Sequence, residues 1–253
     1  MLTILFGALL IGLSLGLLGA GGSIITVPLL AYTLGFDEKQ AIVGALFIVA
    51  TISGVSALLS LRKGEIHFRA AVWLSITGMV GSALAAKLSM WISGELQFIL
   101  LAGIMFLAAW RMLAKQVSLK ESRPASKARL GMTGLGLGGV TGLVGVGGGF
   151  LIVPALVTLA QVPMRVAVPT SLTIIFFNAS AGLANHFIAS SNMVFSLDWH
   201  TLFVFAFVGV IGSFVGQSLA TRLPQQSLKR GFAYIILVLA MGMLIHSCIQ
   251  LFI

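Results

Sequence analysis

Two stretches of the chain combine clustered glycines with a short apolar segment that ends in proline. The first, GLLGAGGSIITVP, begins at Gly16, and the second, GLVGVGGGFLIVP, begins at Gly142. A glycine inside a helix destabilises it by about 1 kcal/mol relative to alanine, so each cluster predicts a break, with a short helix starting near Ser23 or Gly149. The free N–H groups and positive dipole end of such a helix attract anions, and glycine permits close approach to the backbone.

Polar residues in one apolar run extend this candidate anion site. Asn178 lies seven positions after Ser171 and eight after Thr170, so the three share one helical face. Polar groups at membrane depth are costly unless paired and commonly face a cavity, although hydrogen bonding between helices, or close helix packing for the glycines, is an open alternative. The candidate substrate-binding residues are Gly19, Gly21, Gly22, Ser23, Gly145, Gly147, Gly148, Gly149, Thr170, Ser171 and Asn178.

Other kinds of chemistry find little support. All six acidic residues lie in or beside loops, and the single cysteine, Cys248, supplies no metal cluster. GLGLGG at Gly134 follows no predicted strand, and no GxxxxGK[ST] occurs. A serine–histidine hydrolase pairing Ser23 with His186 has nothing to orient the pair. We therefore expect no enzyme, no catalytic residue, no cofactor and no bound metal, with His186 as an interfacial histidine.

The composition places these residues in a membrane. Of the 253 residues, 58% are hydrophobic and only 8% charged, where soluble domains have roughly 25%. Apolar runs fall at 2–34, 41–60, 69–90, 96–113, 131–160, 168–188, 200–221 and 230–252. Most are near the ~20 residues needed to span a bilayer, and the two long ones contain the glycine clusters. The sequence predicts an all-α polytopic membrane protein that contacts lipid and binds no nucleic acid, with its excess positive charge in loops.

The chain contains an internal duplication. With an offset of 126 residues, Gly19 and Pro28 fall on Gly145 and Pro154; further along the offset is 131, so that GMVGS at Gly78 matches GVIGS at Gly209. We expect these last two surfaces to be helix-packing sites. The predicted organisation is an N-terminal membrane repeat (1–114), a basic cytoplasmic linker (115–130) and a C-terminal membrane repeat (131–253), each repeat a broken hairpin plus three spans.

The basic residues predict how the two repeats are oriented. If each long run returns to its starting side, all basic residues except Lys39 and Lys87 lie on the cytoplasmic side, as the positive-inside rule favours. Each repeat then crosses the membrane an odd number of times, so the repeats are inverted, with both termini outside. The glycine tips would meet near the midplane.

The paired glycine motifs, together with VPTSL at Val168 and GVIGSFVG at Gly209, resemble the sulfite exporter TauE/SafE family, also called toluene-sulfonate uptake permeases. The resemblance covers essentially the whole chain. It implies a secondary transporter of small sulfur-containing anions in the cell inner membrane; a passive anion channel or another organic-anion permease is the alternative. Ser23 replaces the third glycine of the first motif, and Gly44 stands where the second half has Thr170. Substrate identity, direction, coupling ion and any homo-oligomer stay open.

Overall fold

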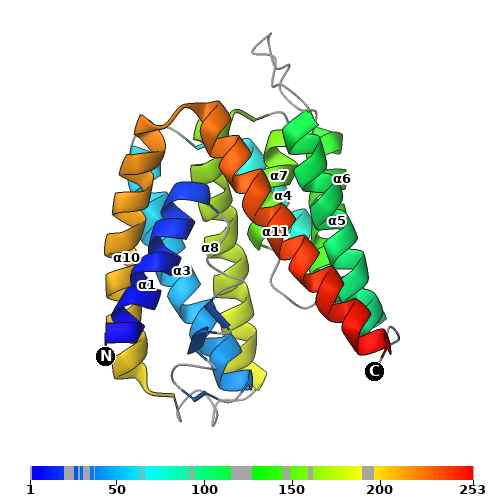
Figure 1. Cartoon of the computed structure of the whole chain (residues 1–253). Helices are drawn as coiled ribbons and strands as arrows, with labels where there is room; N and C mark the ends of the chain where they lie inside the picture. The colour runs from blue at the N-terminus through cyan, green and yellow to red at the C-terminus, as the bar shows by residue number, and fades with distance from the viewer. Residues whose placement is uncertain are drawn as a thin grey trace. The chain divides into compact units, whose positions relative to one another are not determined.

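The computed structural model is built of α-helices (Figure 1). It describes residues 2–19, 26–27, 29–30, 35–36, 38–62, 64, 66–89, 91, 94–114, 127–144, 149–158, 162–189 and 197–252. The helices are α1 (Leu2–Leu18), α3 (Glu38–Arg62), α4 (Phe68–Ser89), α5 (Gly94–Ala114), α6 (Lys127–Val144), α7 (Gly149–Thr158), α8 (Met164–Ala189), α10 (Trp199–Arg222) and α11 (Gln225–Phe252). Within these described residues no strand occurs.

The helices follow the apolar runs, which confirms the all-α membrane class. Stretches of α3, α4, α8 and α10 are long and apolar enough to cross a membrane, and shorter apolar stretches occupy α1, α5 and α6. The second long run is divided as predicted, since α6 ends at Val144 and the short helix α7 begins at Gly149. In the first long run, α1 ends at Leu18.

The chain forms two compact units that do not follow the sequence repeats. Unit 1 comprises residues 1–71 and 165–222, and unit 2 comprises residues 72–164 and 223–253. Each unit therefore contains helices from both predicted halves. The division into 1–114, 115–130 and 131–253 describes similarity within the sequence and stays a prediction; residues 115–126 lie outside the described residues.

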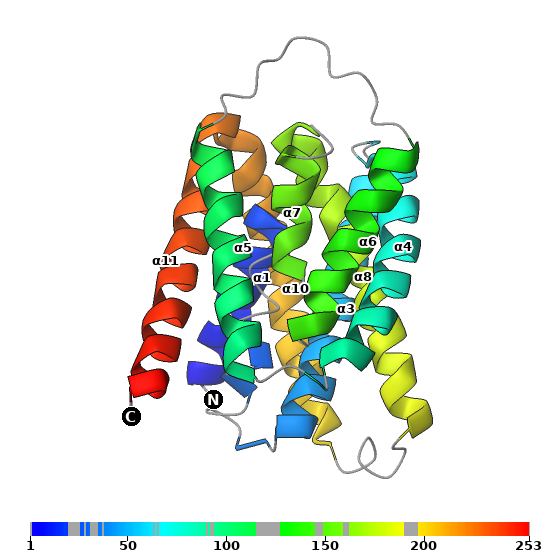
Figure 2. The ribbon, with the colours of Figure 1, turned by 90° about the vertical axis from the view of Figure 1, so that its right-hand side faces the viewer.

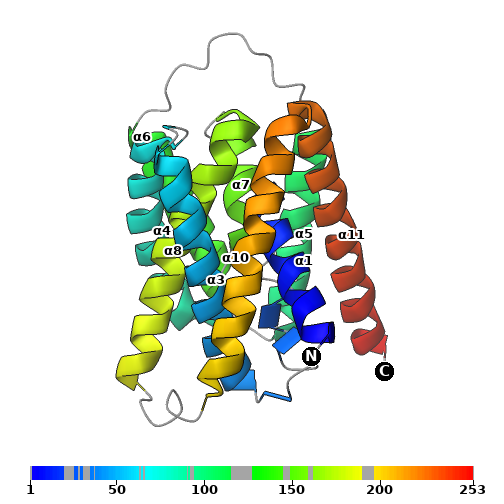
Figure 3. The ribbon, with the colours of Figure 1, turned by 90° about the vertical axis from the view of Figure 1, so that its left-hand side faces the viewer.

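In unit 1, α1 packs along α10 in the same direction, and we call this contact the first seam (Figures 1 and 3). A β-carbon added at Gly12 would lie 2.7 Å from the carbonyl carbon and 2.8 Å from the Cα of Gly209. One added at Gly212 would lie 2.6 Å from the carbonyl oxygen of Leu9 and 3.1 Å from the nitrogen of Leu13. The two backbones are thus in direct contact, which only glycine permits.

In unit 2, α4 and α6 form a second seam with the same contacts. A β-carbon added at Gly138 would lie 2.7 Å from the carbonyl carbon and 2.8 Å from the Cα of Gly78. One added at Gly81 would lie 2.5 Å from the oxygen of Leu135 and 3.0 Å from the nitrogen of Gly139. Gly138 and Leu135 of α6 correspond to Gly12 and Leu9 of α1 at the offset of 126. Gly78 and Gly81 of α4 correspond to Gly209 and Gly212 of α10 at the offset of 131. The predicted packing role of GMVGS and GVIGS is confirmed.

Two further helix pairs run in opposite directions. In unit 1, Leu46 of α3 lies against Gly182 of α8, whereas Gly54, about two turns further along α3, lies against the earlier residue Phe176. In unit 2, α5 and α11 pack side by side (Figure 2), and α5 ends at the level where α11 begins. The partners in each pair occupy equivalent places in the two sequence halves.

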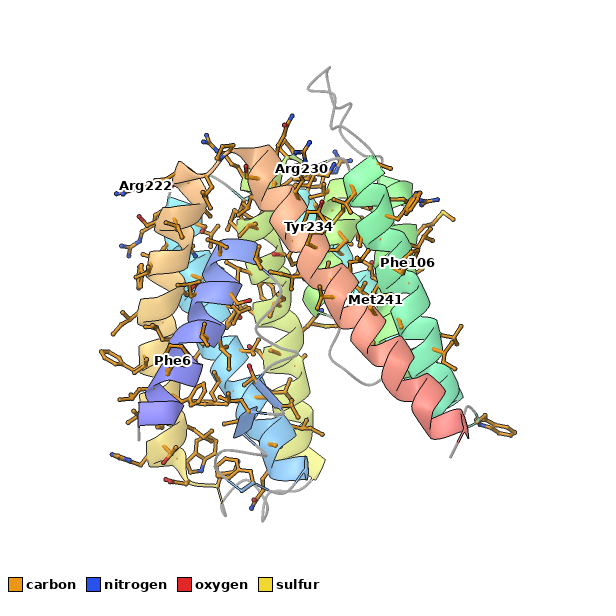
Figure 4. All side chains as sticks on the ribbon, viewed as in Figure 1. Phe6, Phe106, Arg222, Arg230, Tyr234 and Met241 are labelled. Carbon is orange, nitrogen blue, oxygen red and sulfur yellow. The ribbon has the colours of Figure 1, made fainter. Side chains whose placement is uncertain are left out.

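Large apolar side chains project from the outer surface of the helices. Phe6 of α1 is 65% exposed, and Phe106 of α5 and Met241 of α11 also point outward (Figure 4). Exposure of many such side chains is unusual for a soluble monomer and expected for helices that face lipid. Arg222 ends α10 and Arg230 lies in the second turn of α11, as basic residues do near the ends of spans, and Tyr234 lies one turn further along α11.

Candidate functional site

The first glycine motif ends a helix at Gly19. The residue has φ of +70°, a left-handed conformation that other residues adopt at a cost, and its N–H donates to the carbonyl oxygen of Leu15 at 2.8 Å. Gly19 is buried, and a β-carbon there would lie 3.0 Å from the Cα of Val168 on α8. The predicted helix break is therefore present at Gly19, packed directly against α8.

Ser171 joins α8 to this break. Its side chain is fully buried, and its hydroxyl lies 2.8 Å from the carbonyl oxygen of Gly19 and 2.7 Å from that of Val168, to either of which it donates. The last carbonyl groups of a helix have no partner within it, and Ser171 supplies one at the end of α1. Two predicted site residues, Gly19 and Ser171, are thus brought together, with the negative end of the α1 dipole beside them.

The hydroxyl of Thr170, another predicted site residue, contacts His67 and not the break at Gly19. The buried oxygen donates to the carbonyl of Val166 at 2.6 Å and accepts from the backbone N–H of His67 at 3.0 Å. Thr170 therefore fastens α8 to the residues that precede α4. A role for Thr170 in binding a substrate stays a prediction.

Asn178 lies further along α8, inside the stretch able to span a membrane. The residue is half-buried, and its Oδ1 is buried with no hydrogen-bond partner among the described residues. A buried amide oxygen without a hydrogen-bond partner is destabilising, so Oδ1 of Asn178 needs a donor that the described residues do not provide.

Gly149 is the first residue of α7 and is buried, in unit 2. The short helix predicted after the second glycine cluster therefore exists, and it begins at the predicted residue. The other predicted glycine-motif residues, Gly21, Gly22, Ser23, Gly145, Gly147 and Gly148, lie outside the described residues, as does the side chain of His186.

Sequence reasoning missed a buried polar cluster beside the first seam. The hydroxyl oxygens of Ser56 on α3 and Ser213 on α10 are 2.6 Å apart, and Nε2 of Gln217 donates to the backbone oxygen of Ser56 at 3.4 Å. A β-carbon on Gly16 would lie 2.8 Å from the Cα of Ser213. The cluster thus contacts α1 at Gly16, three residues before the break at Gly19. Its sequence signals are weak: Ser56 is one of the few polar residues in the run 41–60, and the serine inside GVIGS also suits simple packing.

The remaining hydroxyls of α3 serve the helix itself. Thr51 donates to the carbonyl of Phe47 at 2.8 Å and Ser53 to that of Val49 at 2.5 Å, each one turn back. In the residues that the structure describes, no group of three His, Cys, Asp or Glu side chains could hold a metal ion. The described part of the site is therefore built from backbone carbonyls, hydroxyls and one amide.

Helices that can span a membrane, an apolar outer surface and a helix broken at a buried glycine define a polytopic membrane protein with an internal polar site. The model of the sulfite exporter TauE/SafE family matches residues 4–243. The chain belongs to this family, and it is a membrane transporter.

Relatives in distant organisms support the same class. A "Probable membrane transporter protein" of Xylella fastidiosa is 30% identical over 246 residues, covering 94% of this chain and 92% of the relative. The "Probable membrane transporter protein YdhB" of Bacillus subtilis is 27% identical, covering 87% of this chain and 90% of its own length. A relative from Methanocaldococcus jannaschii, "Probable membrane transporter protein MJ0441", is 25% identical over 72% of this chain and 70% of its own. No solved structure matches the chain.

Proposed function

We propose that the chain is a secondary transporter of small sulfur-containing anions, such as sulfite or organosulfonates, in the cell inner membrane. Transport would proceed by alternating access of two inverted halves, with the chain acting as an exporter or permease. The substrate class follows from the family's description as sulfite exporters. The glycine breaks and the polar face of α8 would form the binding site.

The observation that carries the proposal is the amide of Asn178. A polar side chain inside a membrane span, with one buried end unpartnered, is typical of a position that meets a substrate or water. The unpartnered Oδ1 can accept a hydrogen bond from water or from a protonated anion such as hydrogensulfite, and the N–H groups of the same amide can donate to the oxygens of the anion. In unit 2, the start of α7 at Gly149 has the backbone N–H groups and the positive dipole end that the sequence predicts for an anion-binding helix.

The helix directions support the inverted relation of the halves. By the offset of 126, α3 and α8 are equivalent, and they run antiparallel; α5 and α11 also occupy equivalent places and run antiparallel. The repeated contacts of the two seams support the duplication itself. Antiparallel equivalents are what an inverted repeat requires, and a parallel repeat would place them in the same direction.

The experiment is calorimetric binding of sulfite to the purified protein and to Asn178→Leu. Leucine has nearly the shape of asparagine, so we expect the fold to be retained while affinity for sulfite falls about tenfold or more through the loss of hydrogen bonds. Thr173→Val is the matched control, because Thr173 lies on the same helix but donates to the carbonyl of Pro169 at 3.0 Å. Unchanged affinity in Asn178→Leu would remove Asn178 from the site.

A further inference from the structure

The helices α4 and α10 begin with the same turn at equivalent sequence positions. Before α4, the N–H of Phe68 donates to the carbonyl of Ile66 at 3.0 Å; before α10, the N–H of Trp199 donates to that of Leu197 at 2.9 Å. The next bonds also match, from Ala71 to His67 at 3.0 Å and from Leu202 to Asp198 at 3.1 Å. Each pair of positions differs by 131, the offset of this part of the duplication.

The helices α4 and α10 differ in the residue that caps them. Oδ1 of Asp198 accepts from the N–H of Thr201 at 3.3 Å, and Nδ1 of His67 accepts from the N–H of Ala70 at 3.1 Å. A backbone N–H can only donate, so Nδ1 of His67 must lack a proton, and the ring is neutral with its proton on Nε2. The same cap is therefore made by a carboxylate in one half and by a neutral imidazole in the other.

His67 is also bonded to the helix that carries the candidate site. Its backbone N–H donates to Thr170, and the neighbouring Ser171 holds the carbonyl of Gly19. His67 lies four residues before Ala71, where the chain leaves unit 1 and enters unit 2 within the first turn of α4. His67 thus holds the start of α4 through its ring and α8 through its backbone N–H, so that the residue between these two bonds is half-buried.

We propose that His67 is a proton-binding site that makes the start of α4, and through Thr170 the site helix α8, responsive to pH. This rests on the proposed function only for its effect on transport. A proton taken from water forms an N–H bond at Nδ1, which then cannot accept from Ala70. The positive ring also lies at a helix N-terminus, where the dipole disfavours a cation. Ala70 retains its backbone bond to the carbonyl of His67 at 2.9 Å, so the cap is weakened and not abolished.

The charged groups on the surrounding elements bear on this proton. Arg62 ends α3, Arg69 is in the first turn of α4 and Arg165 is at the start of α8. All three side chains are exposed, and Arg165 donates to the backbone oxygen of Thr221 at 3.3 Å. Water and salt screen the charges of such exposed side chains. Histidine is the side chain that ordinarily gains charge between about pH 8 and pH 5.

The first test measures hydrogen exchange of the purified full chain at about pH 8 and pH 5.5, corrected for intrinsic exchange rates. We expect residues 66–72 to lose protection about threefold at the lower pH, the size of a partial cap loss, while residues 197–203 do not change. His67→Asn keeps an uncharged acceptor and should remove the response. His200→Asn, at an exposed histidine beside Asp198, is the matched control and should keep it. Equal protection of residues 66–72 at both pH values, or an unaltered response in His67→Asn, would overturn the proposal.

The second test measures sulfite flux in proteoliposomes across the same pH range. We expect the pH dependence of the rate to be reduced in His67→Asn and retained in His200→Asn. If exchange responds as expected but the flux of His67→Asn keeps its full pH dependence, the coupling to transport is wrong and the proton site stands. If no variant and no wild-type protein carries sulfite, the proposed function fails independently of the exchange result.

Discussion

The first seam, between α1 and α10, and the second seam, between α4 and α6, have the same backbone contacts but different polar surroundings. Gly12 meets Gly209 as Gly138 meets Gly78, with matching 2.7 and 2.8 Å approaches. Beside the first seam, Ser213 is bonded to Ser56. The position equivalent to Ser56 in the other half is Gly182, which has no hydroxyl. The comparison teaches that duplicated backbone packing persisted while the hydrogen bonds around it diverged.

This divergence bears on how two similar halves form one transporter. Each unit is built around one seam and contains helices of both halves, so neither half buries its own first helix by itself. The Ser56–Ser213 pair distinguishes the first seam, and the break at the end of α1 is held by Ser171 on the helix that carries Asn178. We therefore expect the two seams to be equally important for folding but unequal in their effect on the site.

The largest effects should come from adding bulk to either seam. Gly12→Val and Gly138→Val would each drive a side chain into the facing backbone, which we expect to destabilise the protein by about 3 kcal/mol or more. Thermal unfolding in detergent measures the effect. Gly136→Val is the matched control on α6, because a β-carbon there meets nothing within 4 Å. Tolerance of Gly138→Val with loss of the fold in Gly12→Val would mean that the seams are not equivalent.

A smaller effect should separate the two seams. Ser56→Ala or Ser213→Ala leaves the other buried hydroxyl without its partner, which we expect to cost about 1–2 kcal/mol. The double variant should cost less than the sum of the two, because both members of the pair are then removed. Ser82→Ala, at the position equivalent to Ser213, should change stability little, since Gly182 offers no hydroxyl. A double-mutant cycle by thermal unfolding decides; strictly additive single effects would mean that the pair contributes no coupling.

Much of the fold could be predicted from the sequence because its signals are local. The apolar runs gave the helices, and the glycine cluster gave the break at Gly19, because backbone conformation and membrane length act over a few residues. The matched GMVGS and GVIGS segments also predicted packing surfaces, which the close contacts at Gly78 and Gly209 confirm.

The partners of the polar side chains depend on which helices face one another. The helical period of a sequence does not contain this information. Thr170 shares a face with Ser171 and Asn178, yet its hydroxyl meets His67, because residues one turn apart on a helix can face different neighbours. The Ser56–Ser213 pair joins residues 157 positions apart. The interleaving of the halves in each unit likewise follows from tertiary packing, so the sequence division into repeats could not predict it.

The smallest expected effect compares the starts of the two helices that carry GMVGS and GVIGS. Hydrogen bonds from the side chain and then the backbone of Thr201 lower the pKa of Asp198 below its ordinary value of 3.8. A carboxyl whose pKa is lower in the folded state stabilises the fold above the unfolded value and loses that contribution as the pH falls through the folded one. Asp198→Asn keeps a capping acceptor and removes only the charge. We therefore expect wild-type protein to have a slightly higher Tm than Asp198→Asn at neutral pH. The difference should begin to shrink as the pH falls to the ordinary pKa of the carboxyl and disappear once it is below the lowered pKa of the folded state. His67 is the equivalent cap of α4, and the same melting curves test the response to protonation proposed for it. Melting curves of wild type, Asp198→Asn and His67→Asn from pH 8 to the acid limit of the detergent-solubilised protein separate the two. The nearby charge of His200 also lowers the pKa of Asp198, so the Asp198→Asn comparison is repeated in a His200→Asn background. A Tm difference that still changes in the histidine range there would mean that Asp198 is not an independent cap.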